Sequence, residues 1–357
     1  MIGQALLSSA INQMERGRIP DSLIRWGIRR LCKTRLKEET AHSLSGEMEG
    51  FIRGLPSSPI AVETDSANEQ HYELPAEFFQ LVLGENRKYS GCYFPAGTND
   101  LDTAEKLALE ETCARAQIKD GMKILELGCG WGSLTLWMAR HFPNCQITAV
   151  SNSQSQREFI EALAASENLT NVTIVTADMN EFSTDKNFDR VVSVEMFEHM
   201  RNYRVLLERI SDWLSPHGLL FVHIFCHREF SYPFETEGND DWMGKYFFTG
   251  GIMPGENLLD EFQEHMSSAK KWVWNGEHYE KTSNAWLENM DSKKPAVMKV
   301  LRATYGDKEA ALWFQRWRVF FMACAELFGF DGGKEWYVSH TLYERTADKK
   351  ALSGANG

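Results

Sequence analysis

Two glutamates and a histidine stand close together after an apolar run, in residues 194–200 (VEMFEHM). Glu195, Glu198 and His199 are spaced i, i+3 and i+4, so a helix that begins here would carry all three on one face. Carboxylates and an imidazole can accept, hold or donate a proton during a reaction. The structural alternative is that the carboxylates only favour the first turn of a helix, while the histidine packs in a core.

A glycine-rich turn is the strongest motif. Residues 126–132 (ELGCGWG) separate a strand-like KIL from a helix-like LTLWMARHF. Gly128 and Gly130 let the backbone turn tightly and approach a ligand, and the following helix begins with unpaired N–H groups. The turn lacks the spacing of GxGxxG and the lysine of a P-loop. It resembles the loop with which class I methyltransferases bind S-adenosylmethionine, and Glu126 opens it. A purely structural turn is the alternative.

Polar residues follow the next two predicted strands. Asp178, in the sequence TADMN, stands where class I methyltransferases hydrogen-bond the adenine amino group, and Met179 would pack on the adenine ring. A turn aspartate that faces solvent is the alternative. The preceding strand lacks at its end the acidic residue that commonly binds the ribose hydroxyls. We therefore expect Asn152 and Gln156 to make these contacts.

Strand-like and helix-like segments alternate through the middle of the chain. Strands are expected at 122–127, 146–153, 172–177, 188–197 and 218–225, with helices at 134–142, 154–167 and 203–214 between them. This alternation predicts right-handed βαβ units and a parallel sheet with both faces covered. Ligands bind such sheets beyond the carboxyl ends of the strands, which is where the motifs above lie.

The flanking regions have a different pattern. After Cys226 a strand is expected at 270–279, helices at 283–328 and a last strand at 335–345; large aromatics at helical spacing in 242–248 and 313–328 indicate mainly core packing. We divide the chain into an N-terminal helical cap and lid (1–115), a Rossmann-like cofactor-binding core (116–226), a helical and aromatic acceptor-side region with a sixth strand (227–330), and a last strand with a polar tail (331–357).

Composition excludes several classes of partner. The 357 residues are 43% hydrophobic and carry a net charge of −12, which argues against nucleic acid and anionic membranes as partners. No run approaches the roughly 18 apolar residues of a membrane span. Seven scattered cysteines without Cys-x-x-Cys, and no secretory signal, predict reduced thiols in a cytoplasmic protein with no metal site. A monomer and a homodimer both stay open.

Seven segments together resemble the coclaurine-type N-methyltransferases, a group within the cyclopropane fatty acid synthase superfamily. The resemblance spans residues 17–345 and implies an α/β class I methyltransferase core, with a mostly parallel seven-stranded sheet, an N-terminal helical cap and a helical insertion before the last strand. It also implies S-adenosylmethionine as the cofactor and the nitrogen of a small benzylisoquinoline- or phenylalkylamine-like amine as the methyl acceptor. The segments are HYELP (71–75), YSGCYF (89–94), ELGCGWGSLTL (126–136), SNSQSQREFI (151–160), VEMFEHMRNY (194–203), FVHIFCHREF (221–230) and FFMACAELFG (320–329).

The resemblance assigns roles to single residues. Glu198 and His199 would be the catalytic pair with Glu195 beside them, and Glu73, next to Tyr72, would face the substrate amine. An amine is mostly protonated at pH 7, so a group that accepts its proton and holds the nitrogen in line is required. The positions that would contact the cofactor are Tyr89, Ser90, Glu126, Gly128, Gly130, Asn152, Gln156, Asp178, Met179 and Val194.

A lipid-modifying alternative stays open. The fatty-acid branch has Tyr-Ser/Thr-Cys where this chain has Tyr89-Ser-Gly91, and Cys92 comes one residue late. Yet His223 and Tyr279 stand where that branch has bicarbonate ligands, so both are candidates for the substrate side of the site. The acidic charge balance, Glu73 and the lack of an evident membrane-binding element count against this alternative.

Overall fold

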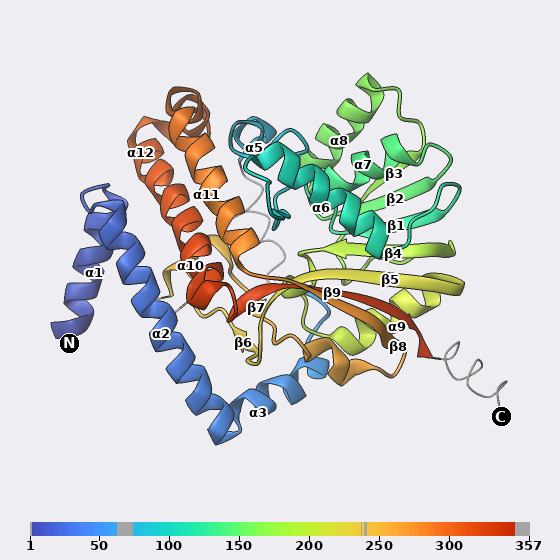
Figure 1. Ribbon diagram of the computed structural model, residues 1–357, viewed down its shortest axis with the longest axis horizontal. Coiled ribbons are helices and arrows are strands. Elements are labelled where there is room, and N and C mark those ends of the chain that lie inside the picture. Colours follow the sequence, from blue (N-terminus) through green and yellow to red (C-terminus); the bar gives the residue numbers. More distant parts are fainter. Residues whose placement is uncertain (1, 63–73, 237, 239–240, 347–357) are drawn as a thin grey trace.

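Seven strands form one sheet in the middle of the molecule (Figure 1). The computed structural model describes residues 2–62, 74–236, 238 and 241–346. The strands are β1 (Lys123–Leu127), β2 (Gln146–Ser151), β3 (Val172–Thr176), β4 (Phe188–Val194), β5 (Leu214–His227), β8 (Met266–Trp274) and β9 (Trp336–Arg345), in the order β3-β2-β1-β4-β5-β9-β8. The first five pair in parallel, and β9 is antiparallel to β5 and β8. The predicted mostly parallel sheet is confirmed.

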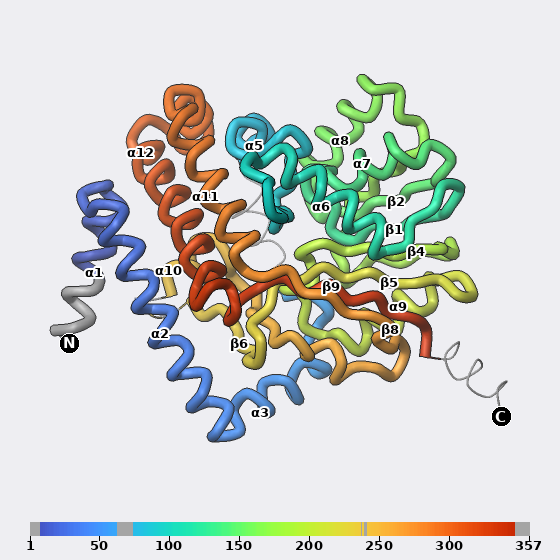
Figure 2. The backbone as a smooth tube through the Cα atoms, viewed as in Figure 1, coloured from blue at the N-terminus to red at the C-terminus, as the bar shows by residue number. Residues whose placement is uncertain are grey.

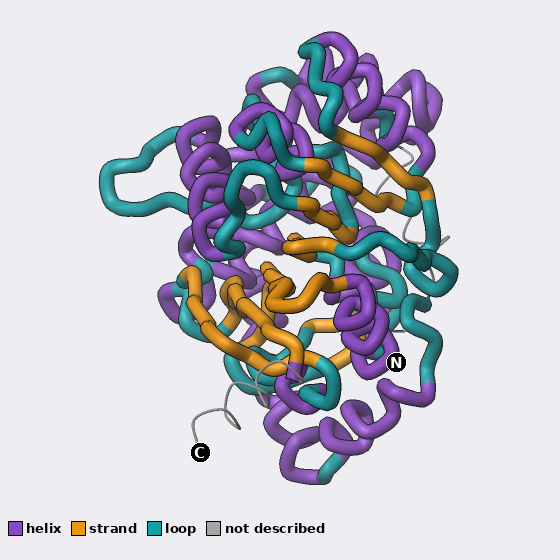
Figure 3. The backbone as a smooth tube through the Cα atoms, turned by 90° about the vertical axis from the view of Figure 1, so that its right-hand side faces the viewer, coloured by secondary structure: helices purple, strands orange, loops and turns teal. Residues whose placement is uncertain are grey.

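Helices cover both faces of the parallel strands, as Figure 3 shows from the side. They are α6 (Leu101–Arg115), α7 (Ser133–His141), α8 (Gln154–Ser166) and α9 (Tyr203–Trp213). Successive side chains of a strand point to opposite faces. Ile124 accordingly belongs to the apolar cluster with α6 and α7, whereas Leu125 and Leu127 belong to the cluster with α9. The sheet is therefore buried on both faces, as the alternation of strands and helices in the sequence predicts.

Two long helices lie between β8 and β9, which confirms the predicted helical insertion before the last strand. They are α11 (Glu277–Ser292) and α12 (Lys294–Phe328), and α12 is kinked at Gly306, whose φ is 79°. The strand expected at 270–279 is wrong at its end, because β8 stops at Trp274 and Tyr279 is helical. Gly276 explains the change of direction: a Cβ there would lie 2.1 Å from the carbonyl oxygen of Phe328 and 2.2 Å from that of Trp336.

The segment between β5 and β8 holds β6 (Tyr232–Pro233), α10 (Trp242–Phe247), β7 (Ile252–Met253) and a 3-10 turn, η3 (Leu258–Phe262). Its aromatic residues pack against α12, where the rings of Phe247 and Phe320 stack with centroids 4.4 Å apart. Trp317 and Phe321 are fully buried in the same cluster. For Phe247, Trp317 and Phe321, which do not line the cavity, the core interpretation is confirmed.

The N-terminal helices form an arm beside the C-terminal ones (Figures 1 and 2). They are α1 (Ile2–Glu15), α2 (Asp21–Ser45) and α3 (Glu47–Gly54); η1 (Leu55–Ser57) and α5 (Ala76–Val82) follow. Arg25 of α2 donates to Glu326 of α12 (Nη1 to Oε1, 2.8 Å), and Arg318 of α12 donates to Asp21 (Nη2 to Oδ2, 2.6 Å). These ion pairs hold α2 against α12.

All seven cysteines are free, and all but Cys324 are buried. The reduced thiols expected from the sequence stay a prediction. No helix in the described parts of the chain combines the length and the apolar character that crossing a membrane requires.

Candidate active site

A cavity of ≈ 240 Å³ opens beyond the carboxyl ends of β1, β2 and β4. The predicted site residues that line it are Tyr89, Ser90, Glu126, Gly128, Gly130, Asn152, Gln156, Met179, Val194, Glu195, His199 and Tyr279. Asp178, Glu198 and His223 are not among the lining residues, and Tyr72 and Glu73 lie outside the described residues. The structure thus brings most of the predicted residues to one place.

The glycine turn has the left-handed backbone that glycine favours. Gly128, Gly130 and Gly132 have φ values of 79°, 50° and 79°. A Cβ on Gly130 would meet no atom within 4 Å, so this glycine leaves its side of the cavity open for a ligand. A Cβ on Gly128 would lie 2.7 Å from Cβ and Cγ of Met196. Glycine is therefore required at 128 by protein packing as well, which sequence reasoning did not foresee.

Several buried polar atoms on the glycine-turn side have no hydrogen-bond partner among the described residues. They are Trp131 Nε1, Ser133 Oγ and Gln156 Nε2. All three residues line the cavity. Buried polar atoms in folded proteins are normally paired, so this set indicates a bound polar ligand. The ribose hydroxyls, adenine nitrogens and amino-acid group of S-adenosylmethionine fit donors of this kind, and Gln156 was predicted from sequence to make such a contact.

Glu126 begins the glycine turn at the end of β1. Its Oε2 accepts a hydrogen bond from Thr135 Oγ1 at 2.5 Å, and burial raises the pKa of its carboxyl group to about 8. A neutral carboxyl of this kind can be ionised by a ligand that brings a positive charge or hydrogen-bond donors to it. Glu126 is thus placed to respond to a bound cofactor.

Asp178 follows β3 between two residues that line the cavity, Ala177 and Met179. Its Oδ1 accepts a hydrogen bond from the backbone N–H of Asn180 at 2.6 Å, the side-chain-to-backbone bond of an aspartate turn. One carboxylate oxygen of Asp178 thus makes the contact expected of a turn aspartate, the alternative to a role in binding adenine. Its contact with adenine stays a prediction.

The helix expected from Glu195 to His199 is wrong. Glu195 has a φ of 49°, and residues Phe197–His199 make only one 3-10 turn, η2. The backbone N–H of Glu195 still bonds the carbonyl oxygen of His223 at 2.9 Å, which extends the β4–β5 pairing by one residue before the chain turns. A left-handed φ is uncommon outside glycine, so contacts of the side chain must support it. Because of this turn, the three side chains do not share a helical face.

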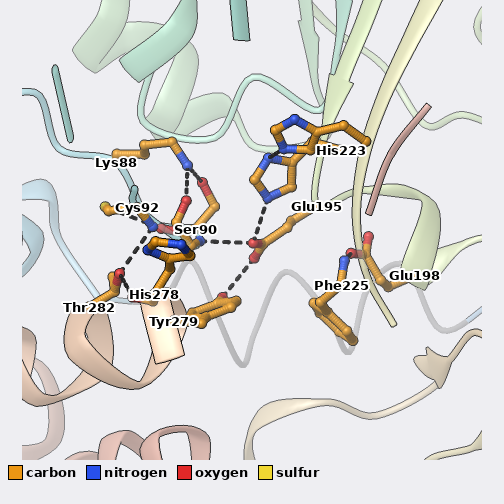
Figure 4. A network of polar contacts seen from close by, with 12 residues as sticks. Lys88, Ser90, Cys92, Glu195, Glu198, His223, Phe225, His278, Tyr279 and Thr282 are labelled. Carbon is orange, nitrogen blue, oxygen red and sulfur yellow. Dashed lines mark hydrogen bonds and ion pairs between the residues drawn. The ribbon is translucent and has the colours of Figure 1, made fainter. Parts of the chain in front are cut away.

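The carboxylate of Glu195 is held by three donors from three other segments (Figure 4). Its Oε1 accepts from Gly91 N–H at 2.8 Å and from His223 Nε2 at 3.1 Å. Its Oε2 accepts from Tyr279 Oη at 2.7 Å. The two candidate bicarbonate ligands, His223 and Tyr279, are therefore already bonded to a carboxylate of this chain. His223 is fully buried, so any influence it has on a substrate passes through Glu195.

Gly91 explains the departure from the Tyr-Ser/Thr-Cys pattern. A Cβ at this position would lie 3.1 Å from Cδ1 of Tyr279 and 3.3 Å from Cγ2 of Val338, so a side chain here would press on the Glu195 network. Cys92 is fully buried, and burial raises the pKa of its thiol. Its backbone N–H bonds Thr282 Oγ1 at 3.0 Å. Cys92 is thus a packed thiol, and it does not line the cavity.

Glu198 lies behind the cavity wall. Its Oε1 accepts from the backbone N–H of Phe225 at 2.7 Å, and its Oε2 has no hydrogen-bond partner among the described residues. Burial, reinforced by the nearby charge of Glu195, raises the pKa of Glu198 well above its ordinary value. His199 lines the cavity and stacks on Phe248, with ring centroids 4.6 Å apart. The predicted catalytic pairing of Glu198 with His199 stays a prediction.

Lys88 is a site residue that sequence reasoning missed. It is buried and lines the cavity, and its Nζ donates to Ser90 Oγ and to the carbonyl oxygen of Gly91, both at 2.6 Å. Burial lowers the pKa of its amine, while Glu195 acts in the opposite direction. The sequence feature that could have indicated Lys88 is its position directly before the predicted cofactor residues Tyr89 and Ser90.

Aromatic and sulfur-containing side chains close the side of the cavity away from the glycine turn. Phe248 follows α10, Trp286 comes from α11, and Phe320 and Phe328 come from α12. Aromatic faces attract cations, so such a wall suits an apolar ligand with a positive charge. The remaining members of this wall are Phe225, Phe234, Met243, Met253, Cys324 and Leu327.

Comparisons with known proteins find relatives over most of this chain. The model of the mycolic acid cyclopropane synthetase family matches residues 61–333. The (S)-coclaurine N-methyltransferase of Thalictrum flavum subsp. glaucum is 36% identical over 358 residues, 96% of this chain and 97% of that protein. The cyclopropane-fatty-acyl-phospholipid synthase of Escherichia coli (strain K12) is 30% identical over 232 residues, 64% of this chain and 57% of that protein.

A solved structure extends the likeness to three dimensions. The crystal structure of coclaurine N-methyltransferase bound to N-methylheliamine and SAH aligns with a TM-score of 0.90 and 36% identity, covering 94% of this chain and 99% of that one. Both the predicted class I methyltransferase fold and the suspected resemblance are thereby confirmed. The chain belongs to the mycolic acid cyclopropane synthetase family and, within it, to the coclaurine-type N-methyltransferases.

Proposed function

We propose that this protein is an S-adenosylmethionine-dependent N-methyltransferase whose acceptor is a small aromatic amine of the benzylisoquinoline or phenylalkylamine type. The observation that carries the proposal is a single cavity with two different sides. Unpaired donors and the glycine turn line one side, and a buried carboxylate with an aromatic wall lines the other. The first side suits a polar cofactor, and the second side suits an ammonium group attached to an apolar, aromatic body.

The cofactor side would hold S-adenosylmethionine, which supplies a methyl group on a sulfonium centre. Gly128, Gly130, Tyr89 and Ser90 would contact the methionine part of the cofactor. Asn152 and Gln156 would bind the ribose, Asp178 the adenine amino group, and Met179 the adenine ring, while Val194 lines the floor of the cavity. The unpaired Gln156 Nε2 supports this arrangement most directly.

The acceptor side would bind and deprotonate the amine. The negative charge of Glu195 attracts an ammonium group, and the aromatic wall stabilises its apolar part. His199, the imidazole on the cavity surface, would accept or orient the amine proton. Glu198, as a neutral carboxylic acid behind the cavity wall, would help to position the turn that carries His199. From the sequence we also propose Glu73 and Tyr72, which lie outside the described residues, as partners of the ammonium form.

The test is a panel of soluble aralkylamines with methyl-labelled S-adenosylmethionine in bicarbonate-free buffer. Transfer of label to an amine is the expected result. A parallel reaction with vesicles of unsaturated phospholipid and added bicarbonate tests the lipid-modifying alternative, which His223 and Tyr279 kept open. Cyclopropane formation in the vesicles, with no labelled amine across the panel, would overturn the proposal.

The remaining points concern the cellular compartment and the oligomeric state of the protein. Seven free cysteines suit a reducing compartment, and we propose the cytoplasm. The choice between a monomer and a homodimer is measured directly by analytical ultracentrifugation of the purified chain.

A further inference from the structure

A line of hydrogen bonds runs from the surface of α6 through the sheet to Glu195. Arg115 Nη1 lies 2.8 Å from His340 Nδ1, and His340 Nε2 lies 2.9 Å from His223 Nδ1. His223 Nε2 then reaches Glu195 Oε1 at 3.1 Å. Both imidazoles are 0% exposed, whereas the side chain of Arg115 is 11% exposed. We name this line the Arg115–Glu195 relay; Figure 4 shows its Glu195 end.

The chemistry of the two ends fixes the direction of every bond. An arginine can only donate, so His340 Nδ1 must accept and its proton must sit on Nε2. That N–H donates to His223 Nδ1, which leaves the proton of His223 on Nε2, facing the carboxylate. Each imidazole is therefore neutral in this arrangement. Burial and nearby cations, Arg115 among them, lower the pKa of both histidines well below its usual range.

The fold holds the relay together through the sheet and the indole of Trp274. His223 of β5 and His340 of β9 are direct partners in the antiparallel register. Trp274 of β8 packs on both rings, with centroids 5.6 Å and 4.3 Å away. The guanidinium of Arg115 lies 5.4 Å from the same indole and pairs with Glu111 (Nε to Oε1, 2.7 Å). Aromatic packing of this kind keeps water from the bonds and fixes their geometry.

Two buried carboxylates compete for one negative charge, and the relay favours one of them. Burial raises the pKa of both carboxyl groups. Three donors and the nearby Lys88 counteract this at Glu195, whereas among the described residues Glu198 accepts only from backbone N–H groups. Close carboxylates do not readily ionise together. The donor set therefore places the charge on Glu195 and the proton on Glu198. The other titratable groups facing Glu195 are Tyr279 of α11, Cys324 of α12 and Cys92 of the preceding loop.

We propose that His340 and Arg115 are positioning residues that act through His223 to keep Glu195 ionised and correctly oriented beside the reacting atoms. The inference rests on the proposed function. Without His340, His223 loses the N–H donor to its Nδ1 that fixes its tautomer, and its Nε2–H is no longer directed at Glu195. The pKa of Glu195 should then rise, and the acidic limb of the pH–rate profile should move to higher pH.

The experiment compares two substitutions at one position. In His340→Gln the amide can still accept from Arg115 and donate to His223, whereas His340→Leu fills the space without either bond. For His340→Leu we expect kcat to fall about 10- to 100-fold, as when a group that orients an active-site ligand is removed, with KM and S-adenosylhomocysteine affinity nearly unchanged. His340→Gln should restore most of the rate. Ser339→Ala, one residue earlier on β9 and buried without a hydrogen-bond partner among the described residues, is the matched control.

A second measurement is independent of the acceptor. Nitrogen NMR of the S-adenosylhomocysteine complex should show His223 and His340 neutral, each with its proton on Nε2, at pH 7. Arg115→Met removes the donor to His340 Nδ1 at a side chain that is 11% exposed, so His340 should adopt either tautomer even if His340→Leu fails to fold. A charged ring, the opposite tautomer, or a pH–rate profile of His340→Leu that superimposes on wild type would overturn the relay. A chain with these tautomers that methylates no amine would contradict the proposed function alone.

Discussion

The two sides of the cavity differ in the polar groups that they offer to a ligand, although the acceptor side also holds a donor without a partner among the described residues, Trp286 Nε1. On the cofactor side, donors such as Gln156 Nε2 and Ser133 Oγ are buried without partners among the described residues. On the acceptor side, the carboxylate of Glu195 already receives three hydrogen bonds from the chain. Unpaired groups mark where a ligand completes the structure, whereas a complete network sets an electrostatic field before any ligand arrives.

This contrast also separates binding from chemistry. Changes on the cofactor side should alter affinity and leave saturated turnover almost unchanged, because the groups there contact parts of the cofactor that do not react. Changes on the acceptor side should alter turnover, because the preset charge acts on the transferring methyl group and the amine. The predictions that follow test this separation.

The largest effect is expected from Gly128→Val. The added Cβ would lie 2.7 Å from the side chain of Met196, and the left-handed φ of 79° disfavours a branched residue. S-adenosylhomocysteine should then give no shift in thermal unfolding, and Tm itself should fall. Gly130→Ala is the matched control because its Cβ meets no protein atom. It should lose ligand affinity with a smaller change in Tm, and a normal ligand response in Gly128→Val would contradict the prediction.

His199→Ala is expected to lower kcat about 10²- to 10⁴-fold at pH 7, the range for loss of a general base. Activity should recover in part as the pH rises, since the free amine then supplies its own lone pair. The measurement is the pH–rate profile with a verified acceptor, and cofactor affinity should stay at the wild-type value. Wild-type kcat/KM at pH 7 would show that the imidazole is structural.

The two glutamates should respond differently to the same change. Glu195→Gln removes the charge and turns an amide N–H₂ toward groups that donate, so we expect kcat to fall about 10²- to 10³-fold, as for loss of a preorganised electrostatic group. Glu198→Gln replaces a carboxyl that already carries its proton, because burial and Glu195 raise its pKa. We expect a loss of about 10-fold or less at pH 7, the cost of one altered buried hydrogen bond. Equal losses would contradict the assignment of the charge to Glu195.

The smallest effect is expected from Gln156→Leu on the cofactor side. This change removes the unpaired donor and also the acceptor of the 2.6 Å bond from Ser151 Oγ. The affinity for S-adenosylhomocysteine should fall about 10-fold, as for one lost hydrogen bond, while kcat at saturating cofactor stays near wild type. Isothermal titration with steady-state kinetics measures both. A fall in kcat without a change in affinity would contradict the assignment of binding to the cofactor side and of turnover to the acceptor side.

The sequence determined the parts of this protein that depend on neighbours along the chain. The glycine turn, the alternation of strands and helices and the order of elements follow from local periodicity, and the structure confirms the sheet and the helical insertion. The same local reasoning failed from Glu195 to His199, where a helical spacing is present but the backbone turns at once. A pattern of residue types does not reveal that a side chain has better partners elsewhere.

Only the tertiary structure decided what surrounds Glu195. Its donors come from a loop, from β5 and from α11, and the relay behind His223 joins residues 115 and 340, which are 225 positions apart in the chain. Such contacts depend on the register of β9 between β5 and β8 and on the helical insertion, neither of which is encoded in a short segment. The physical reason is that the charge of a buried carboxylate depends on all the donors around it, and the fold alone brings those donors together.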